Sequence, residues 1–236
     1  ANGVGSVTVT DAGSQLTAAG GTFIGRNADG MVNVSNGGAF IVSNDPLGLG
    51  GLSVGSGRAG SVVASGEIDV TTGGTLIDQA SLTVGAIGNI GRLNIDHGLV
   101  QVGTQAIIGL GGVNSTGTTA VATSGTLTIG TGGTFALTSA PQRVSSGVVI
   151  GTSNIDSNAV STAVASVSGA GALLDTNGNG LSVGSRGTGS LTISGGGHVV
   201  AGTPDSSAIA GLGIARQGNG TVAVFGNGSQ LTVAGA

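Results

Sequence analysis

Carboxylates are the side chains of this sequence with the greatest potential for chemistry. A glycosidase needs two carboxyl groups about 5–10 Å apart, and neighbouring strands of a sheet lie about 4.8 Å apart. Acids at matching positions of adjacent strands could therefore work as a pair, and Asp69 and Asp96 come closest to matching, with an offset of two positions. The ten acids are Asp11, Asp29, Asp45, Glu67, Asp69, Asp78, Asp96, Asp156, Asp175 and Asp205.

The residues that would complete an enzyme are missing from the composition. Repeat-built enzymes that cleave polysaccharides also present aromatic platforms and basic side chains, whereas this chain has no Trp or Tyr and no Lys. The two histidines, His97 and His198, stand at different repeat positions and have no nucleophile or metal partner in the sequence pattern. We therefore expect no enzymatic activity and no catalytic, cofactor-binding or metal-binding residue.

Three kinds of motif imitate functional sites, and each has a simpler structural interpretation. Gly51–Gly55 and Gly180–Gly184 match G-x-S-x-G, a nucleophile elbow that requires a strand-to-helix turn, but no helix-like segment follows either of them. Gly55–Gly60 matches G-x-G-x-x-G, which must open a helix, yet strand-like residues follow it. Asp175–Gly180 resembles the start of an EF-hand loop, whose final Glu is replaced by Arg186, so an Asx-rich corner is the better interpretation.

Arginines recur just after one phrase of the sequence. Stacked on one corner, they would form a basic seam for anionic polysaccharide or lipopolysaccharide. The favoured interpretation is a solvated corner whose arginines pair with nearby acids such as Asp29, because exposed pairs contribute little. The four arginines are Arg26, Arg58, Arg186 and Arg216.

Composition excludes several classes of protein. The 236 residues include six basic and ten acidic ones, for a net charge of −4, whereas nucleic-acid binding needs clustered Lys and Arg. No Cys is present, which excludes a disulfide framework, and no apolar run reaches the roughly 18 residues of a membrane span. The chain starts at Ala1-Asn2-Gly3 without the features of a signal peptide, so we expect any such peptide to have been removed.

One recurring phrase predicts the elements of the chain. It consists of apolar-x-apolar, a small polar turn that often holds Gly-Gly, and apolar-x-apolar again, with a second phrase ending in Val-Gly or Ile-Gly between copies. Apolar residues alternate with polar ones in Val7–Thr10 and Leu127–Ile129, which is the period of a half-buried strand. Eight copies begin near residues 5, 30, 66, 91, 125, 163, 189 and 220, and the last is cut short.

Each copy therefore holds three short strands separated by glycine corners, which is one coil of a parallel β-helix. Such coils bury their inward residues only by stacking on their neighbours, and glycine suits the corners because positive φ or close approach is needed there. The predicted fold is all-β, a β-solenoid of about eight coils that forms one domain over residues 1–236 and a rod on the order of 40 Å long. Longer segments at Ser56–Ser65, Leu110–Ser124 and Thr152–Ser161 are expected to be loops outside the coils.

The outward positions of the first strand of each coil should form a flat ladder of short polar groups. Regular Thr columns occur on ice-binding β-helices, but here Thr alternates with Asn, Asp, Ser and Ala, which disfavours ice binding. A flat polar face with little charge favours side-by-side association of copies. The ladder residues are Thr8, Asn33, Asp69, Asn94, Thr128, Ser166, Thr192 and Ala223.

Over nearly its whole length the repeat resembles that of bacterial autotransporter (type V secreted) passenger domains. Such repeats alternate between a form like V-x-V-x-G-x-G-S and a form like L-x-I-x-x-G-G. The first form is matched at Val7–Leu16, Ala165–Leu174 and Val222–Leu231. The second form is matched at Val32, Ile68, Leu127 and Leu191. The residue after G-S-x, often aromatic in such repeats, is leucine here.

This resemblance implies a secreted, surface-displayed, right-handed β-helix, attached to an outer-membrane translocator barrel that these residues do not contain. The expected function is that of an adhesin or structural stalk on the outer surface of a bacterium, which mediates cell–cell or cell–surface attachment or self-association. Its expected partners are further copies of itself, host or abiotic surfaces, or glycans, and neither nucleic acid nor a cofactor. An extracellular filament of stacked subunits is the alternative, and a polysaccharide-active enzyme is the least favoured.

Overall fold

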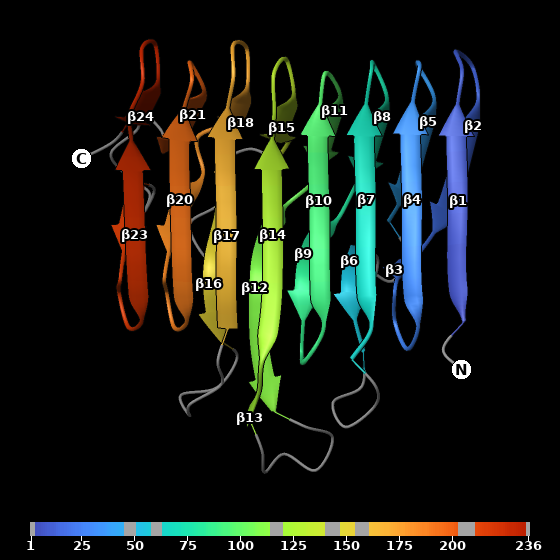
Figure 1. Ribbon diagram of the computed structural model, residues 1–236, viewed down its shortest axis with the longest axis horizontal. Coiled ribbons are helices and arrows are strands. Elements are labelled where there is room, and N and C mark those ends of the chain that lie inside the picture. Colours follow the sequence, from blue (N-terminus) through green and yellow to red (C-terminus); the bar gives the residue numbers. More distant parts are fainter. Residues whose placement is uncertain are drawn as a thin grey trace.

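The chain folds into three parallel sheets that wind around a common core (Figure 1). The computed structural model describes residues 3–44, 51–57, 63–113, 120–139, 147–153, 161–202 and 211–234. Within these ranges every regular element is a strand. Each of the first seven turns of the chain contributes one strand to each sheet, and the eighth contributes one strand to each of two sheets. The prediction of an all-β parallel β-helix with about eight coils of three strands is confirmed.

The strands of each sheet follow one another in chain order. Sheet A comprises β1 Val4–Thr10, β4 Asp29–Ser35, β7 Ser65–Thr71, β10 Ile90–Asp96, β14 Thr123–Ile129, β17 Ser161–Ser168, β20 Thr188–Ser194 and β23 Asn219–Val224. Sheet B comprises β2 Gln15–Ala19, β5 Ala39–Ser43, β8 Thr75–Asp78, β11 Leu99–Val102, β15 Thr134–Leu137, β18 Leu173–Asp175, β21 His198–Gly202 and β24 Gln230–Ala234. Sheet C comprises β3 Gly21–Ile24, β6 Gly51–Ser56, β9 Ser81–Ala86, β12 Gln105–Val113, β16 Gly147–Ser153, β19 Gly180–Val183 and β22 Leu212–Ile214. We number the coils from coil 1 (β1–β3) to coil 8 (β23 and β24).

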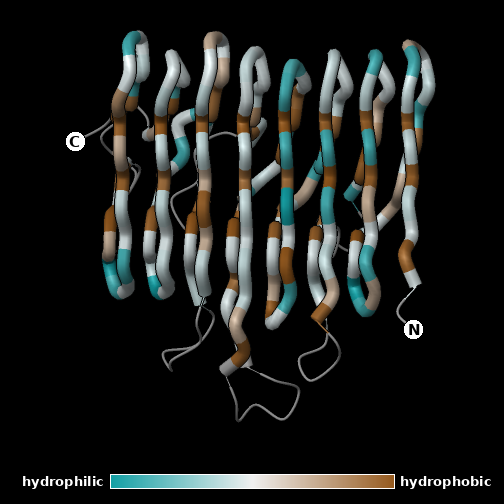
Figure 2. The backbone as a smooth tube through the Cα atoms, viewed as in Figure 1, coloured by the Kyte–Doolittle hydropathy of each residue, from teal (hydrophilic) through white to brown (hydrophobic). Residues whose placement is uncertain are grey.

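Alternating side chains build the core because successive residues of a strand point to opposite faces. In β7 the inward residues Ile68 and Val70 are fully buried, whereas Glu67 and Asp69 between them are half-buried. Figure 2 shows this alternation along the strands. The inward side chains of the three sheets join in one cluster of Val, Leu, Ile, Ala and Phe that runs along the rod.

Glycines allow the backbones of sheets C and A to pack closely at the corner between them. In coil 4, a Cβ atom added to Gly91 would lie 2.1 Å from the backbone nitrogen of Gly85 and 2.3 Å from the carbonyl oxygen of Val54. Each other glycine of this column has its added Cβ between 2.2 and 2.7 Å from the backbone nitrogen of a positive-φ residue that lies inside or just after a strand of sheet C. These glycines are Gly30, Gly66, Gly125, Gly189 and Gly220. Ala163 occupies this column in coil 6.

Tight turns join each strand of sheet A to the following strand of sheet B. In coil 2, Asn36 and Gly37 have φ values of 52° and 83°, and the turn is closed by a hydrogen bond from Gly38 N to Ser35 O at 2.8 Å. Thr72 takes the same conformation in coil 3, with φ 46°. The longer connections all lie at the other two corners, after a strand of sheet B or of sheet C, so they leave the A–B edge of the rod smooth.

The predicted loops begin later than expected. Strand β12 continues past the predicted boundary at Leu110 to Val113 and pairs antiparallel with β13 Ala120–Val121. Ser56, Thr152 and Ser153 likewise extend strands of sheet C, because the glycine with positive φ inside each of these strands bends the chain without ending its pairing with the neighbouring coil. The described residues contain no helix long and apolar enough to cross a membrane.

Candidate interaction face

The outer face of sheet A carries the predicted ladder in register across all eight strands. Each member pairs with the next through parallel strands, from Thr8 opposite Asn33 to Thr192 opposite Ala223. The intervening pairs join Asn33, Asp69, Asn94, Thr128, Ser166 and Thr192 in that order. Of these side chains Thr8 is exposed and the others are half-buried, so the ladder is a row of short groups on a flat surface.

A polar cluster of three side chains lies in the middle of this face. The Asn94 Nδ2 atom donates to Glu67 Oε1 at 3.0 Å and to Asp69 Oδ1 at 2.8 Å. One amide group therefore bridges two carboxylates of the adjacent coil. Arg92 lies opposite Glu67 in the strand register, so coils 3 and 4 present four charged or amide side chains as a compact block.

The carboxylates that the structure brings together are not the pair singled out from the sequence. Asp69 lies opposite Asn94, and Asp96 lies opposite Thr71, so the two acids keep their offset of two positions. Glu67 and Asp69 instead stand side by side on one strand. Their spacing of two residues in a period-two strand was the available signal, since such residues share a face.

A fourth acid on this face is tied to a serine. Asp29 Oδ1 accepts hydrogen bonds from the backbone nitrogen of Ser65 at 2.8 Å and from its hydroxyl group at 2.7 Å. These bonds stabilise the ionised form and lower the pKa of Asp29 below its ordinary value. The expected ion pair between Asp29 and an arginine is absent from the described residues, because Arg26 stacks on the Phe23 ring at 4.4 Å.

Charge is unevenly distributed over sheet A. All of its charged residues lie on β4, β7 and β10, whereas β1, β14, β17, β20 and β23 contain none. These residues are Asp29, Glu67, Asp69, Arg92 and Asp96. One end of the face is therefore acidic, and coils 5 to 8 present a neutral surface of Thr, Ser, Val, Ala and Asn.

The remaining motifs take structural roles. Ser53 and Ser182 of the two G-x-S-x-G matches lie in the middle of sheet C strands, paired with neighbouring strands and without a following helix. The Asp175 Oδ1 atom accepts from Asn177 N at 2.7 Å, which is the predicted Asx corner. In the part of the chain that the structure describes, no three His, Cys, Asp or Glu side chains lie close enough to hold a metal ion. The second half of Gly55–Gly60, from residue 58 on, lies outside the described residues.

The histidines and arginines are spread along the rod. His97 Nδ1 lies 3.2 Å from Asp96 Oδ1, and His198 Nε2 lies 3.0 Å from the carbonyl oxygen of Gly228. Arg26 follows β3 of coil 1, whereas Arg186 and Arg216 follow β19 and β22 of coils 6 and 7. The basic seam is therefore not continuous: the described corners of coils 3 to 5 carry no arginine, and Arg58 lies outside the described residues.

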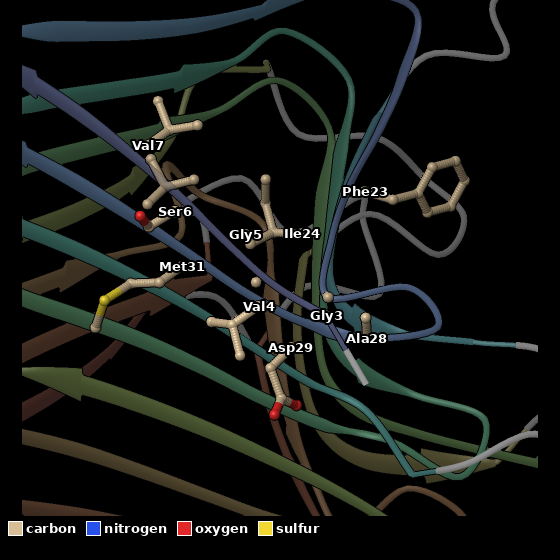
Figure 3. A pocket seen from close by; sticks show the side chains of 13 residues that line it. Gly3, Val4, Gly5, Ser6, Val7, Phe23, Ile24, Ala28, Asp29 and Met31 are labelled. Atoms are coloured by element: carbon tan, nitrogen blue, oxygen red, sulfur yellow. The ribbon is translucent and has the colours of Figure 1, made fainter. Parts of the chain in front are cut away.

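A hollow of about 510 Å³ opens beside coil 1. Figure 3 shows its lining, which includes Val4, Val7 and Ile24 together with Met31 of β4. Val4 is 77% exposed and Val7 42%, because no further strand of the described chain pairs with β1 on that side. The hollow is thus the open edge of the first coil, where the inward side chains of Val7 and Ile24 are only partly covered.

These features define a parallel β-solenoid with one flat polar face, which only tight turns border along its A–B edge. Comparison with known protein families finds no match for this chain, and searches of curated proteins and of solved structures find no match either.

Proposed function

We propose that this chain is a bacterial surface-displayed or secreted β-solenoid, which acts as an adhesive stalk and attaches cells by self-association. The observation that carries the proposal is the in-register polar ladder of sheet A, whose strands are joined to those of sheet B only by tight turns. Eight strands of about seven residues, at about 4.8 Å between strands and about 3.3 Å per residue, give this face about 900 Å². A stable association buries about 800 Å² per partner, so one face supplies enough area.

The distribution of charge favours one arrangement of two faces. If two copies meet with their coils in the same order, the carboxylates of coils 2 to 4 face each other, and like charges at close range are unfavourable. If the coil order is reversed, the acidic coils of each copy face the neutral coils 5 to 7 of the other. We therefore place the two rods side by side in reversed order.

Display of the chain on bacterial cells tests the function. Cells that carry it should settle and attach to surfaces faster than cells that carry the display anchor alone, and added soluble chain should suppress the effect by occupying the face. Equal settling and attachment of the two strains would overturn the proposal.

Two matched threonines of coil 5 test the face. Thr128 lies on sheet A and Thr134 on sheet B, and both are half-buried. In reversed order, Thr128→Glu should weaken association of the purified chain and Thr128→Lys should strengthen it, because position 128 faces coil 4 of the partner, next to Glu67 and Asp69 of coil 3. Thr134→Glu should leave association unchanged. If both Thr128 variants associate like the parent chain, sheet A is not the face.

The exposed end coils favour filament formation as a second candidate. Val7 in coil 1 is 42% exposed, and Val224 and Val233 in coil 8 are 45% and 42% exposed, although the matching residues of inner coils are fully buried. Unpaired strand edges with apolar side chains favour pairing with another chain. Sedimentation of the 236-residue chain should then show rods that lengthen with concentration, and a single monomeric species would refute this candidate.

A further inference from the structure

A buried carboxylate interrupts an apolar column at the corner between sheets B and C. Asp78 ends β8, is 1% exposed, and lies opposite Val42 and Val102 of the neighbouring coils. Its Oδ1 atom accepts a hydrogen bond from Ala80 N at 3.1 Å, and its Oδ2 atom accepts one from Leu52 N at 3.2 Å. Coil 3 therefore has an acid that accepts hydrogen bonds from two backbone N–H groups, at a position where coils 2 and 4 have a valine.

The bond to Leu52 crosses from coil 3 to coil 2. There the chain makes one of its longer connections, between Asn44 and Gly51. Gln79 holds the start of that connection, since its Oε1 atom accepts from Asn44 N at 3.3 Å and its carbonyl oxygen accepts from Asn44 Nδ2 at 3.0 Å. Asp78 and Gln79 thus anchor both ends of the connection to the core of the next coil.

We propose that Asp78 is an acid-strengthened latch, which holds coils 2 and 3 together more firmly when its carboxyl group is neutral than when it is ionised. The ionised form accepts both N–H groups, but its charge lies among apolar side chains and away from water, which is costly. Admitting water by opening the corner relieves that cost. The neutral form carries no such penalty, so it removes the reason for opening.

The balance of these effects gives the direction of the pH dependence. Burial raises the pKa of Asp78 above its ordinary value of 3.8, and the hydrogen bonds from Ala80 and Leu52 only partly oppose the rise. At a pH between the ordinary and the raised pKa, Asp78 is protonated in the folded chain and ionised in the unfolded chain. Stability from Asp78 therefore increases as the pH falls through that window and is constant below it.

Asp78 is isolated from other titratable groups in the described structure. The strands packed around it, β5, β6, β9 and β11, contain no titratable side chain. Glu67 and Asp69 of β7 and Asp29 of β4 point outward on sheet A. Asp29 has the opposite dependence, because its lowered pKa gives stability that is lost on acidification. The latch is therefore measured at the two amides that donate to Asp78, and not by the stability of the whole chain.

Hydrogen exchange of the backbone amides of Leu52 and Ala80 tests the latch between pH 7 and pH 4. After correction for intrinsic exchange, their protection should rise on acidification by up to about tenfold per pH unit, since one proton is taken up. Asp78→Asn should abolish the rise, because the amide cannot ionise. Asp175→Asn, at the same corner of coil 6, should retain it.

Each alternative result overturns the latch. Protection that is flat or falls in the parent chain shows that the neutral form does not hold the corner more firmly. A rise that persists in Asp78→Asn, or that disappears in Asp175→Asn, assigns the effect to another group. The pH series on the unmodified chain is decisive even if Asp78→Asn does not fold.

Discussion

A methyl group at Gly91 should destabilise the solenoid more than any change on its surface. Gly91 lies in the glycine column between sheets A and C and does not have positive φ, so its backbone would accept alanine. The obstacle is space, because the added Cβ would lie 2.1 Å from Gly85 N, against 3.4 Å for an ordinary contact. Backbone atoms cannot rotate away as a side chain can, so the coils must separate.

The size of the effect follows from that separation. Overpacking a core costs about 1–3 kcal/mol, and a shift of about 1 Å also stretches backbone hydrogen bonds beyond their usual range, at about 1 kcal/mol each. We expect Gly91→Ala to lower the free energy of unfolding by about 3–5 kcal/mol. With a urea dependence of about 3 kcal/mol per molar, the midpoint should fall by about 1–1.7 M.

Gly5 provides the matched control. It lies in the same column, opposite Gly30, but nothing lies within 4 Å of its added Cβ. Gly5→Ala should therefore leave the urea midpoint, followed by far-ultraviolet circular dichroism, almost unchanged. Ala163 shows that coil 6 accepts a methyl group at this level. If the free energy of unfolding of Gly91→Ala also stays within about 0.5 kcal/mol of that of the parent chain, the close packing at this glycine does not contribute to the stability of the corner.

Two further changes have expected outcomes of opposite sign. Thr72→Gly should raise the free energy of unfolding by about 1 kcal/mol, because a β-branched residue is strained at φ 46°; a lower urea midpoint would show that this turn is not strained. Asn94→Asp should lower it by about 1 kcal/mol, because the amide that bridges Glu67 and Asp69 becomes a third carboxylate. Added salt should recover most of that loss, whereas Thr128→Asp, with no charged neighbour in the ladder, should respond little to salt.

The period-two pattern was sufficient to predict the fold because every coil repeats it. Strands of sheet A begin within two residues of each predicted repeat start, for example Val4 for residue 5 and Ser161 for residue 163. The ladder was also predictable, since identical positions in stacked coils must meet in register. The ends of the sheet C strands were not predictable, because a glycine inside β12 reads as a corner although the strand continues.

The polar details depend on contacts between coils, which the pattern does not encode. Asn94 belongs to the ladder like its neighbours, and only the register shows that it bridges two carboxylates of the adjacent strand. Asp78 was one of ten acids in the sequence, and the only sign of its burial is its place two residues after the inward Leu76. In a period-two strand its place after Ile77 is inward, and burial of a charge at such a position is the exception.

The proposed latch residue Asp78 and the outward carboxylates Glu67 and Asp69 belong to the same coil. This matters because a solenoid is held together by contacts between neighbouring coils. Asp78 is on the inner side of coil 3, whereas Glu67 and Asp69 are on its outer face. In the proposed latch, protonation of Asp78 closes the corner behind that outer face. We therefore expect acidification to hold coil 3 more firmly against coil 2 from its inner side, whereas sheet A carries no charged side chain in coils 5 to 8.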